Sequence, residues 1–202
     1  MGFDRSTTSF TRFRVLDAIP SGMDFEARLK RFAFIDIDDI AEERSFGWTN
    51  FDDMLDTEWK VSPPQKADYL TFSLRLDSRR ISPAVFKKYY RLAIQAEEKA
   101  MAEQGKKFIP KDRRKEIREQ VKFSLLAKTL PIPAEFQVVW QITGNLLYLA
   151  STQSKVIELF TDLFTRTFDL SLEEMLPYSL ASSLLGDGCE AALDSLEATS
   201  FS

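Results

Sequence analysis

The stretch that decides the fold runs from Ser82 to Lys128 and reads SPAVFKKYYRLAIQAEEKAMAEQGKKFIPKDRRKEIREQVKFSLLAK. Ser82 followed by Pro83 is typical of a helix N-cap and of the first helical residue. Gly105 is typical of a left-handed helix end, and Pro110 allows a second helix to begin. We therefore predict two antiparallel helices joined by a short loop, which together form a protruding helical hairpin arm.

This stretch also carries most of the positive charge of an acidic protein. Residues 75–128 contain 16 Lys or Arg and 7 Asp or Glu, a net charge of +9, whereas all 202 residues together carry −4. In the second predicted helix, basic residues recur every three or four positions and form one stripe. Ile117, Val121 and Leu125 form a narrower apolar stripe that can pack on the first helix. Packing of the two helices explains the apolar stripe but does not require the basic one. The basic stripe therefore indicates an anionic partner.

Residue types that are absent or rare exclude several classes of protein. The chain has no histidine, which excludes the Ser-His-Asp and Cys-His arrangements and the common zinc sites. Its single cysteine, Cys189, excludes an internal disulfide. No apolar run approaches the roughly 20 residues that span a bilayer, and the N-terminus lacks the apolar core of a signal peptide. We therefore expect a cytoplasmic protein without a membrane partner.

Strands and further helices are predicted on both sides of the arm. Residues 69–76 alternate most clearly, with Leu70, Phe72 and Leu74 on one face of a strand. The other predicted strands are Thr8–Leu16, Phe46–Phe51, Phe136–Ile142 and Leu146–Ala150, the last two joined by a turn at Thr143–Asn145, and the other predicted helices are Gly22–Phe34 and Ser154–Phe168. This pattern indicates an α+β fold: an antiparallel sheet flanked by helices, with a protruding helical hairpin arm. Residues 1–80 and 134–180 would form the core, 81–133 the arm and its tip, and 181–202 an acidic, disordered tail.

An acidic cluster precedes the predicted strand Phe46–Phe51. Asp36, Asp38 and Asp39 lie within four positions, and clustered carboxylates suit Mg²⁺. The alternative is a solvated acidic loop, which we prefer because no glycine or second acidic group stands at a recognisable spacing. A metal-dependent nuclease that uses these aspartates is thus the least favoured hypothesis. The Glu97-Glu98-Lys99 triplet lies in a helix without a suitable acidic partner, so we expect no catalysis and no cofactor.

The basic residues of the arm allow two interpretations. Lys and Arg repeated along one helix face match the electrostatic footprint of DNA-backbone binding. The alternative is a solvated helix surface with local ion pairs, because acidic residues such as Glu97 and Glu116 are also present. From the residues alone, the predicted DNA contacts are Arg79, Arg80, Lys87, Lys88, Lys106, Lys107, Lys111, Arg114, Lys115, Arg118 and Lys122.

Several short motifs follow one another along the chain. They are Arg31-Phe32-Ala33-Phe34, Gly47-Trp48, Ile81-Ser82-Pro83-Ala84-Val85, Glu103-Gln104-Gly105-Lys106-Lys107, Phe123-Ser124-Leu125-Leu126, Trp140 and Asn145-Leu146-Leu147. In their order and spacing, the chain resembles the bacterial recombination-associated protein RdgC family, as a short member that lacks the family's C-terminal portion.

The resemblance implies a homodimer that closes into a ring around duplex DNA. Such a protein binds DNA through its phosphates without sequence preference, limits recombinase access and associates with the nucleoid. The family's basic positions correspond here to Lys106, Lys107, Lys111, Arg114, Arg118 and Lys128. The dimer contact would involve Phe123 and Leu130, with Leu130 in the place of an aromatic residue at the tip.

The sequence is therefore consistent with two functions from different classes. The first is a non-catalytic, sequence-independent duplex DNA-binding protein that modulates recombination. The second is a protein-interaction module whose basic hairpin docks an acidic protein partner, which the net charge of −4 leaves possible. Neither function requires a small-molecule substrate.

Overall fold

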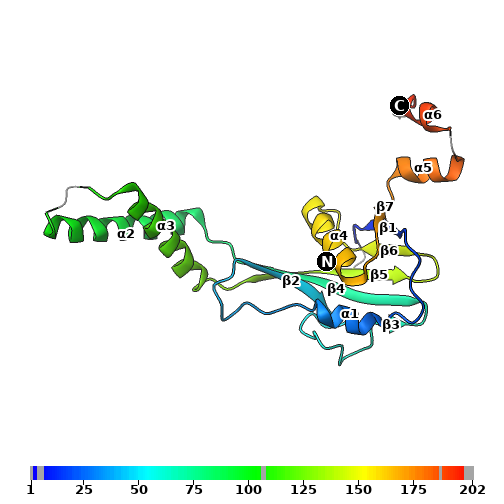
Figure 1. The fold of residues 1–202 in the computed structure, drawn as a ribbon, viewed down its shortest axis with the longest axis horizontal. Coiled ribbons are helices and arrows are strands. Elements are labelled where there is room, and N and C mark those ends of the chain that lie inside the picture. Colours follow the sequence, from blue (N-terminus) through cyan, green and yellow to red (C-terminus); the bar gives the residue numbers. More distant parts are fainter. Residues whose placement is uncertain (1, 4–6, 106–107, 187, 198–202) are drawn as a thin grey trace.

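The computed structural model describes residues 2–3, 7–105, 108–186 and 188–197. Its described strands form one seven-stranded sheet in the order β2-β4-β5-β6-β1-β7, with β3 paired to β4 (Figure 1). The strands are β1 (Thr11–Val15), β2 (Arg44–Thr49), β3 (Gln65–Lys66), β4 (Tyr69–Ser78), β5 (Ile132–Gln141), β6 (Leu146–Leu149) and β7 (Leu172–Glu174). The helices are α1 (Phe25–Arg31), α2 (Pro83–Glu103), α3 (Lys111–Leu126), α4 (Ser154–Phe168), α5 (Pro177–Leu185) and α6 (Glu190–Asp194). The strands pair antiparallel, so the prediction of an antiparallel sheet combined with helices is confirmed.

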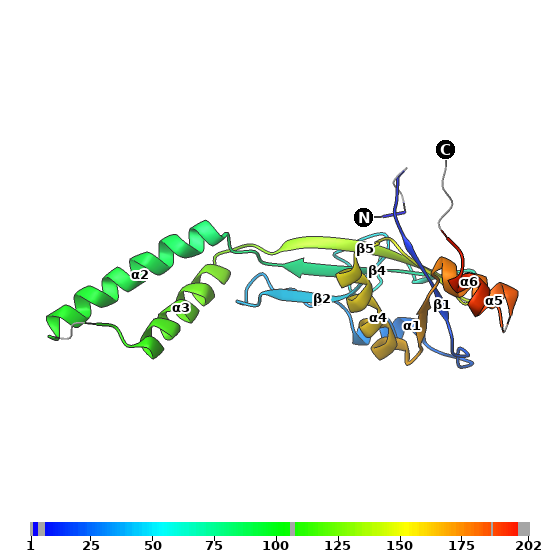
Figure 2. The ribbon, with the colours of Figure 1, turned by 90° about the horizontal axis from the view of Figure 1, so that it is seen from above.

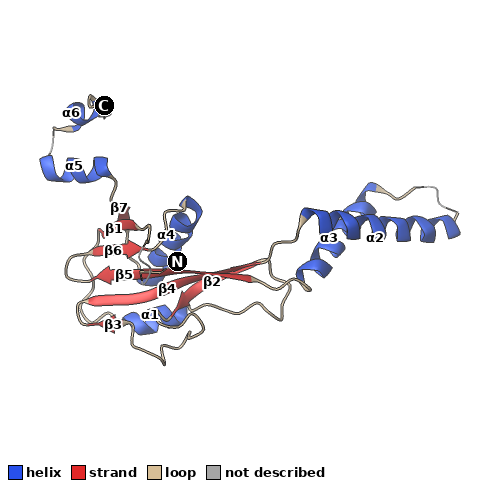
Figure 3. Ribbon diagram, turned by 180° about the vertical axis from the view of Figure 1, so that it is seen from behind, coloured by secondary structure: helices blue, strands red, loops and turns tan. Residues whose placement is uncertain are grey.

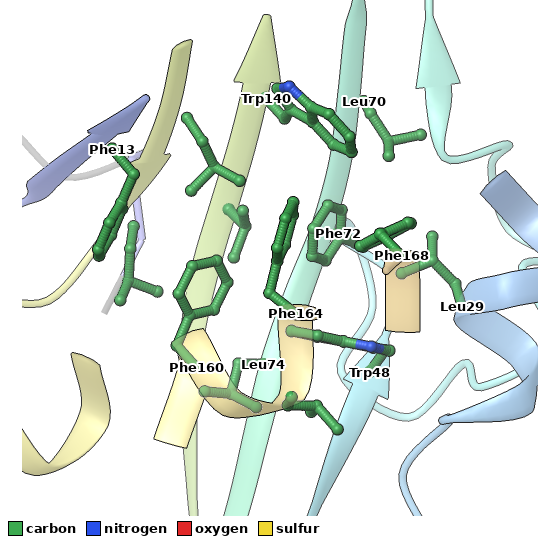
Figure 4. Close-up of a cluster of buried hydrophobic side chains, with 14 of the residues drawn as sticks. Phe13, Leu29, Trp48, Leu70, Phe72, Leu74, Trp140, Phe160, Phe164 and Phe168 are labelled. Carbon is green, nitrogen blue, oxygen red and sulfur yellow. The ribbon is translucent and has the colours of Figure 1, made fainter. Parts of the chain in front are cut away.

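The core lies between one face of the sheet and helices α1 and α4. Helix α4 begins and ends at the predicted residues, and Phe160, Phe164 and Phe168 on one of its faces are buried. Figure 4 shows these rings gathered over Trp48 and Trp140 of the sheet. Burying a large apolar side chain contributes about 1.5–3 kcal/mol, so this aromatic cluster is a major source of stability.

Strand β4 is buried on both faces, although its alternation predicted only one apolar face. Leu70, Phe72 and Leu74 lie in the core, as predicted. Ser73 and Arg75 on the opposite face are also buried. Residues 51–64 reach over this second face, and the carbonyl of Met54 accepts a hydrogen bond of 3.3 Å from Nη1 of Arg75. A polar loop can cover a strand face in this way because it satisfies the polar side chains beneath it.

The predicted first helix is shorter than expected because its last residues join the sheet edge. Helix α1 ends at Arg31, and the N–H of Phe34 then donates to the carbonyl of Trp48 at 2.9 Å. The N–H of Trp48 donates in return to the carbonyl of Phe32 at 3.0 Å. These bonds pair the otherwise open edge of β2 with the chain that follows α1.

Strand β5 begins earlier than predicted. It starts at Ile132, four residues before the predicted Phe136, so Pro133 is part of the strand. Pro133 lies opposite Asp77 of β4. Strands β4 and β5 pair as far as Ser78 and Ile132, with β2 still paired to β4 at Arg44, and they carry α2 and α3 beyond the end of the sheet (Figure 2).

The C-terminal residues contain more regular structure than predicted. Strand β7 adds to the sheet beside β1, and the N–H of Met175 donates to the carbonyl of Arg12 at 2.9 Å. Helices α5 and α6 follow, so the part of 181–202 that the structure describes is partly helical rather than a structureless tail. These two helices lie at the opposite end of the molecule from α2 and α3 (Figures 1 and 3). No helix in the described ranges is both long enough and apolar enough to cross a membrane.

Candidate nucleic-acid interface

Helices α2 and α3 pack against each other through an ion pair and a small apolar contact. Arg113 donates to both carboxylate oxygens of Glu97, from Nε at 2.8 Å and from Nη2 at 3.1 Å. Its Nη1 also donates to Glu116 at 3.0 Å. These hydrogen bonds lower the pKa of Glu97 and raise that of Arg113. Ile117 of the predicted apolar stripe is buried beside them.

The local signals that predicted these helices are placed as expected. Pro83 is the first residue of α2, although the side chain of Ser82 makes no capping hydrogen bond in the structure. Gly105 has a φ of +74°, the left-handed conformation that glycine adopts without steric cost. Helix α3 begins directly after Pro110.

Four of the predicted residues meet at the sheet end of the helix pair. They are Arg79, Arg80, Arg118 and Lys122, and they line a hollow of about 900 Å³ together with Phe86 at the start of α2. The guanidinium carbon of Arg118 lies 5.7 Å from the centre of the Phe86 ring, a cation–π distance. We refer to this cavity as the basal hollow.

The basal hollow is not uniformly positive. Lys122 donates to a carboxylate oxygen of Glu43 at 2.9 Å, and this hydrogen bond raises the pKa of Lys122. Glu119 also lines the hollow. Lys122 is therefore charged but partly compensated, whereas no ion pair of Arg80 or Arg118 occurs within the described residues.

The remaining predicted residues are spread over the helix pair. Lys111, Arg114 and Lys115 continue the stripe of α3 away from the basal hollow, and their side chains are exposed. Arg114 also borders a smaller pocket with Phe108. Exposed basic residues occur in addition on α2, at Lys87 and Lys88, and after α3, at Lys128, which lines a different groove. Lys106 and Lys107 lie outside the described residues.

Arg79 borders the basal hollow, but its predicted role as a DNA contact is wrong. Only 3% of the residue is exposed. Its terminal nitrogens donate to the backbone carbonyls of four residues in the acidic loop that precedes β2, namely Ile37, Asp38, Ile40 and Glu42. A guanidinium held in this way has no terminal nitrogen left for a phosphate.

The same contacts explain the acidic cluster. The loop that suggested a magnesium site wraps its carbonyls around the Arg79 guanidinium, so the cation that it holds is a side chain of the same protein. Asp36 is used within the loop, because its carboxylate accepts from the N–H of Asp38 at 2.7 Å. No group of three or more possible metal-ligating side chains occurs within the described residues.

The two predicted dimer contacts are exposed apolar side chains. Phe123 is 64% exposed and Leu130 is 78% exposed. They lie near the sheet end of α3, where the chain returns to β5, and not at the far end of the helix pair.

Sequence reasoning missed two residues of the basal hollow. Glu43 is 79 positions from Lys122, and no local pattern indicates that the two side chains form an ion pair. Phe86 is not among the predicted site residues, although its position one turn after the start of α2 places it beside the basic stripe. Comparison with protein-family models gives no match, and comparison with curated proteins gives none either.

Proposed function

We propose that this protein is a non-catalytic, sequence-independent duplex DNA-binding protein whose helices α2 and α3 form a basic arm along the duplex. The observation that carries the proposal is the exposed stripe of α3, which continues through Arg118 into the basal hollow with Arg80. From Lys111 to Lys122 the stripe is about 16 Å long at about 1.5 Å per residue. Duplex DNA carries roughly ten phosphates over that length.

The arrangement favours contacts to phosphates over contacts to bases. The basic side chains project from one helix face at intervals of three or four residues, and Lys and Arg spaced in this way neutralise a backbone without reading its sequence. On this proposal two copies dimerise around the duplex through Phe123 and Leu130, in the manner of the RdgC family, which the chain resembles. Such a protein would lie on the nucleoid and restrict the access of recombinases to DNA.

The test is a fluorescence-anisotropy titration of linear and circular duplexes at several salt concentrations. The variant Arg114→Glu/Arg118→Glu should weaken binding and reduce the log–log salt slope by about 0.9 for each phosphate contact that is lost. The control variant Lys60→Glu/Lys155→Glu makes the same charge change at exposed positions of the core and should bind nearly as well. If both variants bind alike, α3 is not the DNA-binding surface.

The same titration tests encirclement. A closed dimer should remain on circular duplex at high salt and slide off free linear ends. Equal salt sensitivity on both substrates would show that the duplex is bound from one side only.

A second candidate is a module whose basic helices dock an acidic protein, and the partial neutralisation of Lys122 by Glu43 favours it. That contact shows that a carboxylate can occupy the basal hollow. On this alternative, acidic polypeptide would bind to the arm while duplex DNA of any sequence would not. Competition between DNA and poly-glutamate for the same variants separates the two functions.

A further inference from the structure

Helix α2 has an apolar face that α3 covers only in part. It has 21 residues, and none of them is buried. Val85 is 42% exposed, Tyr89 44% and Leu92 50%. These positions are four and then three residues apart, so the three side chains lie on one side of the helix. An apolar stripe left open along a helix of this length marks a binding surface.

The stripe forms one wall of a groove between the two helices. The groove has a volume of about 760 Å³, and its other wall consists of Ile117, Val121 and Leu125 of α3. Arg113, bound to Glu97, lies at one end of the groove, and Lys128 lies at the other. Phe123 and Leu130, the residues of the proposed ring contact, do not line it. This groove is therefore a separate surface, which we call the arm groove.

A second uncovered apolar surface lies at the opposite end of the molecule. Around helix α5, Leu176 is 52% exposed, Leu184 77% and Leu185 65%. The segment itself is uniformly negative, because no Lys or Arg follows Arg166 and seven acidic residues lie from Asp169 onward. The C-terminal helices thus combine exposed leucines with acidic residues.

We propose that the arm groove receives helix α5 from a second copy of this chain. The lengths agree: nine residues of α5 measure about 13 Å, and the stripe from Val85 to Ala96 measures about 16 Å. Helix α5 itself has no charged residue, but the residues that flank it are opposite in charge to the arm: residues 75–128 carry +9, and α6 carries Glu190 and Asp194. An amphipathic helix in an apolar groove with complementary charge at the rim is a common mode of recognition.

The donor must be a second copy because the two surfaces of one chain lie far apart. Helices α2 and α3 are at one end of the molecule and α5 is at the other in two perpendicular views (Figures 1 and 2). In the proposed contact each copy uses one surface as acceptor and a different surface as donor. The contact does not depend on DNA, so it can be tested without it.

The first test is the mass of the full-length protein, measured by sedimentation over about two decades of concentration. Self-association should be detected, and it should weaken as salt rises, because the paired charges are solvent-exposed. The donor variant Leu184→Asp/Leu185→Asp and the acceptor variant Leu92→Asp should each weaken it by about tenfold or more. The control Leu55→Asp changes an equally exposed leucine in the loop over the sheet and should associate as the unmodified chain does. A chain that stays monomeric throughout would overturn the proposal.

Mixing the variants gives the sharper result. The donor variant keeps an intact groove and the acceptor variant keeps an intact α5, so the mixture should associate about tenfold or more tightly than either variant alone. A contact through Phe123 and Leu130 alone predicts that the donor variant associates as the unmodified chain does and that mixing adds nothing. Either of those two results would refute the α5 contact.

Cys189 allows the contact to be located directly. It is the only cysteine of the chain and caps α6, next to the proposed donor helix. A benzophenone attached to Cys189 should cross-link to residues 85–128 of a second copy, identified by mixing isotopically labelled and unlabelled protein. Cross-links confined to the chain that carries the label would contradict the proposal.

Discussion

Arg113 of α3 and Glu97 of α2 form a bidentate ion pair, with hydrogen bonds of 2.8 and 3.1 Å. This geometry orients α2 on α3, because both planar groups must align for the two bonds to form together. It also removes Arg113 from the basic stripe, since its third donor group is occupied by Glu116. The pair therefore joins the two helices, while its basic neighbours Arg114 and Arg118 on α3 form no ion pair within the described residues.

The first prediction concerns the acid sensitivity of this contact. Hydrogen bonding from Arg113 lowers the pKa of Glu97 from its ordinary value of 4.5. A lowered carboxyl pKa means that the contact stabilises the helix pair above pH 4.5 and that this contribution is lost as the pH falls through the lowered value. Amide NMR shifts of Ala93 and Ile117 should report the loosening. In Glu97→Gln the contact should already be weak at neutral pH, and the acid transition of these NMR signals should disappear.

The control is Glu98→Gln, on the exposed side of α2, which should retain the acid transition. If the transition also disappears in Glu98→Gln, a group other than Glu97 causes it.

The second prediction separates two adjacent arginines. Arg79→Ala removes the donor that binds the carbonyls of the acidic loop and should lower the free energy of unfolding by about 2–4 kcal/mol. Arg80→Ala changes an exposed residue and should alter it by less than about 0.5 kcal/mol. Urea denaturation followed by tryptophan fluorescence measures both. On the proposed function, Arg80→Ala should instead weaken DNA binding; equal stabilities for the two variants would show that the loop does not depend on Arg79.

The third prediction concerns Gly47. A Cβ atom there would lie 2.5 Å from the Cα and N atoms of Phe34, in the segment that pairs with the edge of β2. Because backbone atoms cannot move aside as a flexible side chain can, Gly47→Ala should destabilise the protein by about 3 kcal/mol. Gly144→Ala is the control, since its Cβ would meet only the flexible side chain of Gln141. Thermal unfolding of the two variants should therefore differ clearly, and similar midpoints would refute the close approach at Gly47.

The fourth prediction rests on the proposed function. Glu43→Gln removes the carboxylate that is bonded to Lys122 and should increase DNA affinity by about two- to fivefold at low salt, because it frees one positive charge of the basal hollow. Glu26→Gln is the matched control, since Glu26 pairs with Lys30 on α1 at 2.8 Å, on the core. Anisotropy titrations compare the variants. An unchanged affinity for Glu43→Gln would exclude Lys122 from the DNA contact.

Patterns between near neighbours predicted the individual elements of this protein. The spacing of Phe160, Phe164 and Phe168 defined α4, because one face of a helix repeats every three or four residues. Pro83 and Gly105 marked the ends of α2, because each restricts or permits particular backbone angles regardless of the rest of the chain. The alternation of Leu70, Phe72 and Leu74 likewise identified the core face of β4.

Only the tertiary structure decided which charged side chains are exposed to solvent and which are buried or paired. Arg79 and Arg80 are equivalent in the sequence, yet one is buried among backbone carbonyls and the other is exposed. The pairing of Glu43 with Lys122 and the cover over Arg75 also join residues far apart along the chain. The sequence by itself determined α2, α3, α4, the core face of β4 and the charge asymmetry, because these depend on local backbone preference and composition. Which charged side chains stay exposed and unpaired depended on long-range packing, because burial and pairing of a charge are set by whatever the folded chain brings next to it.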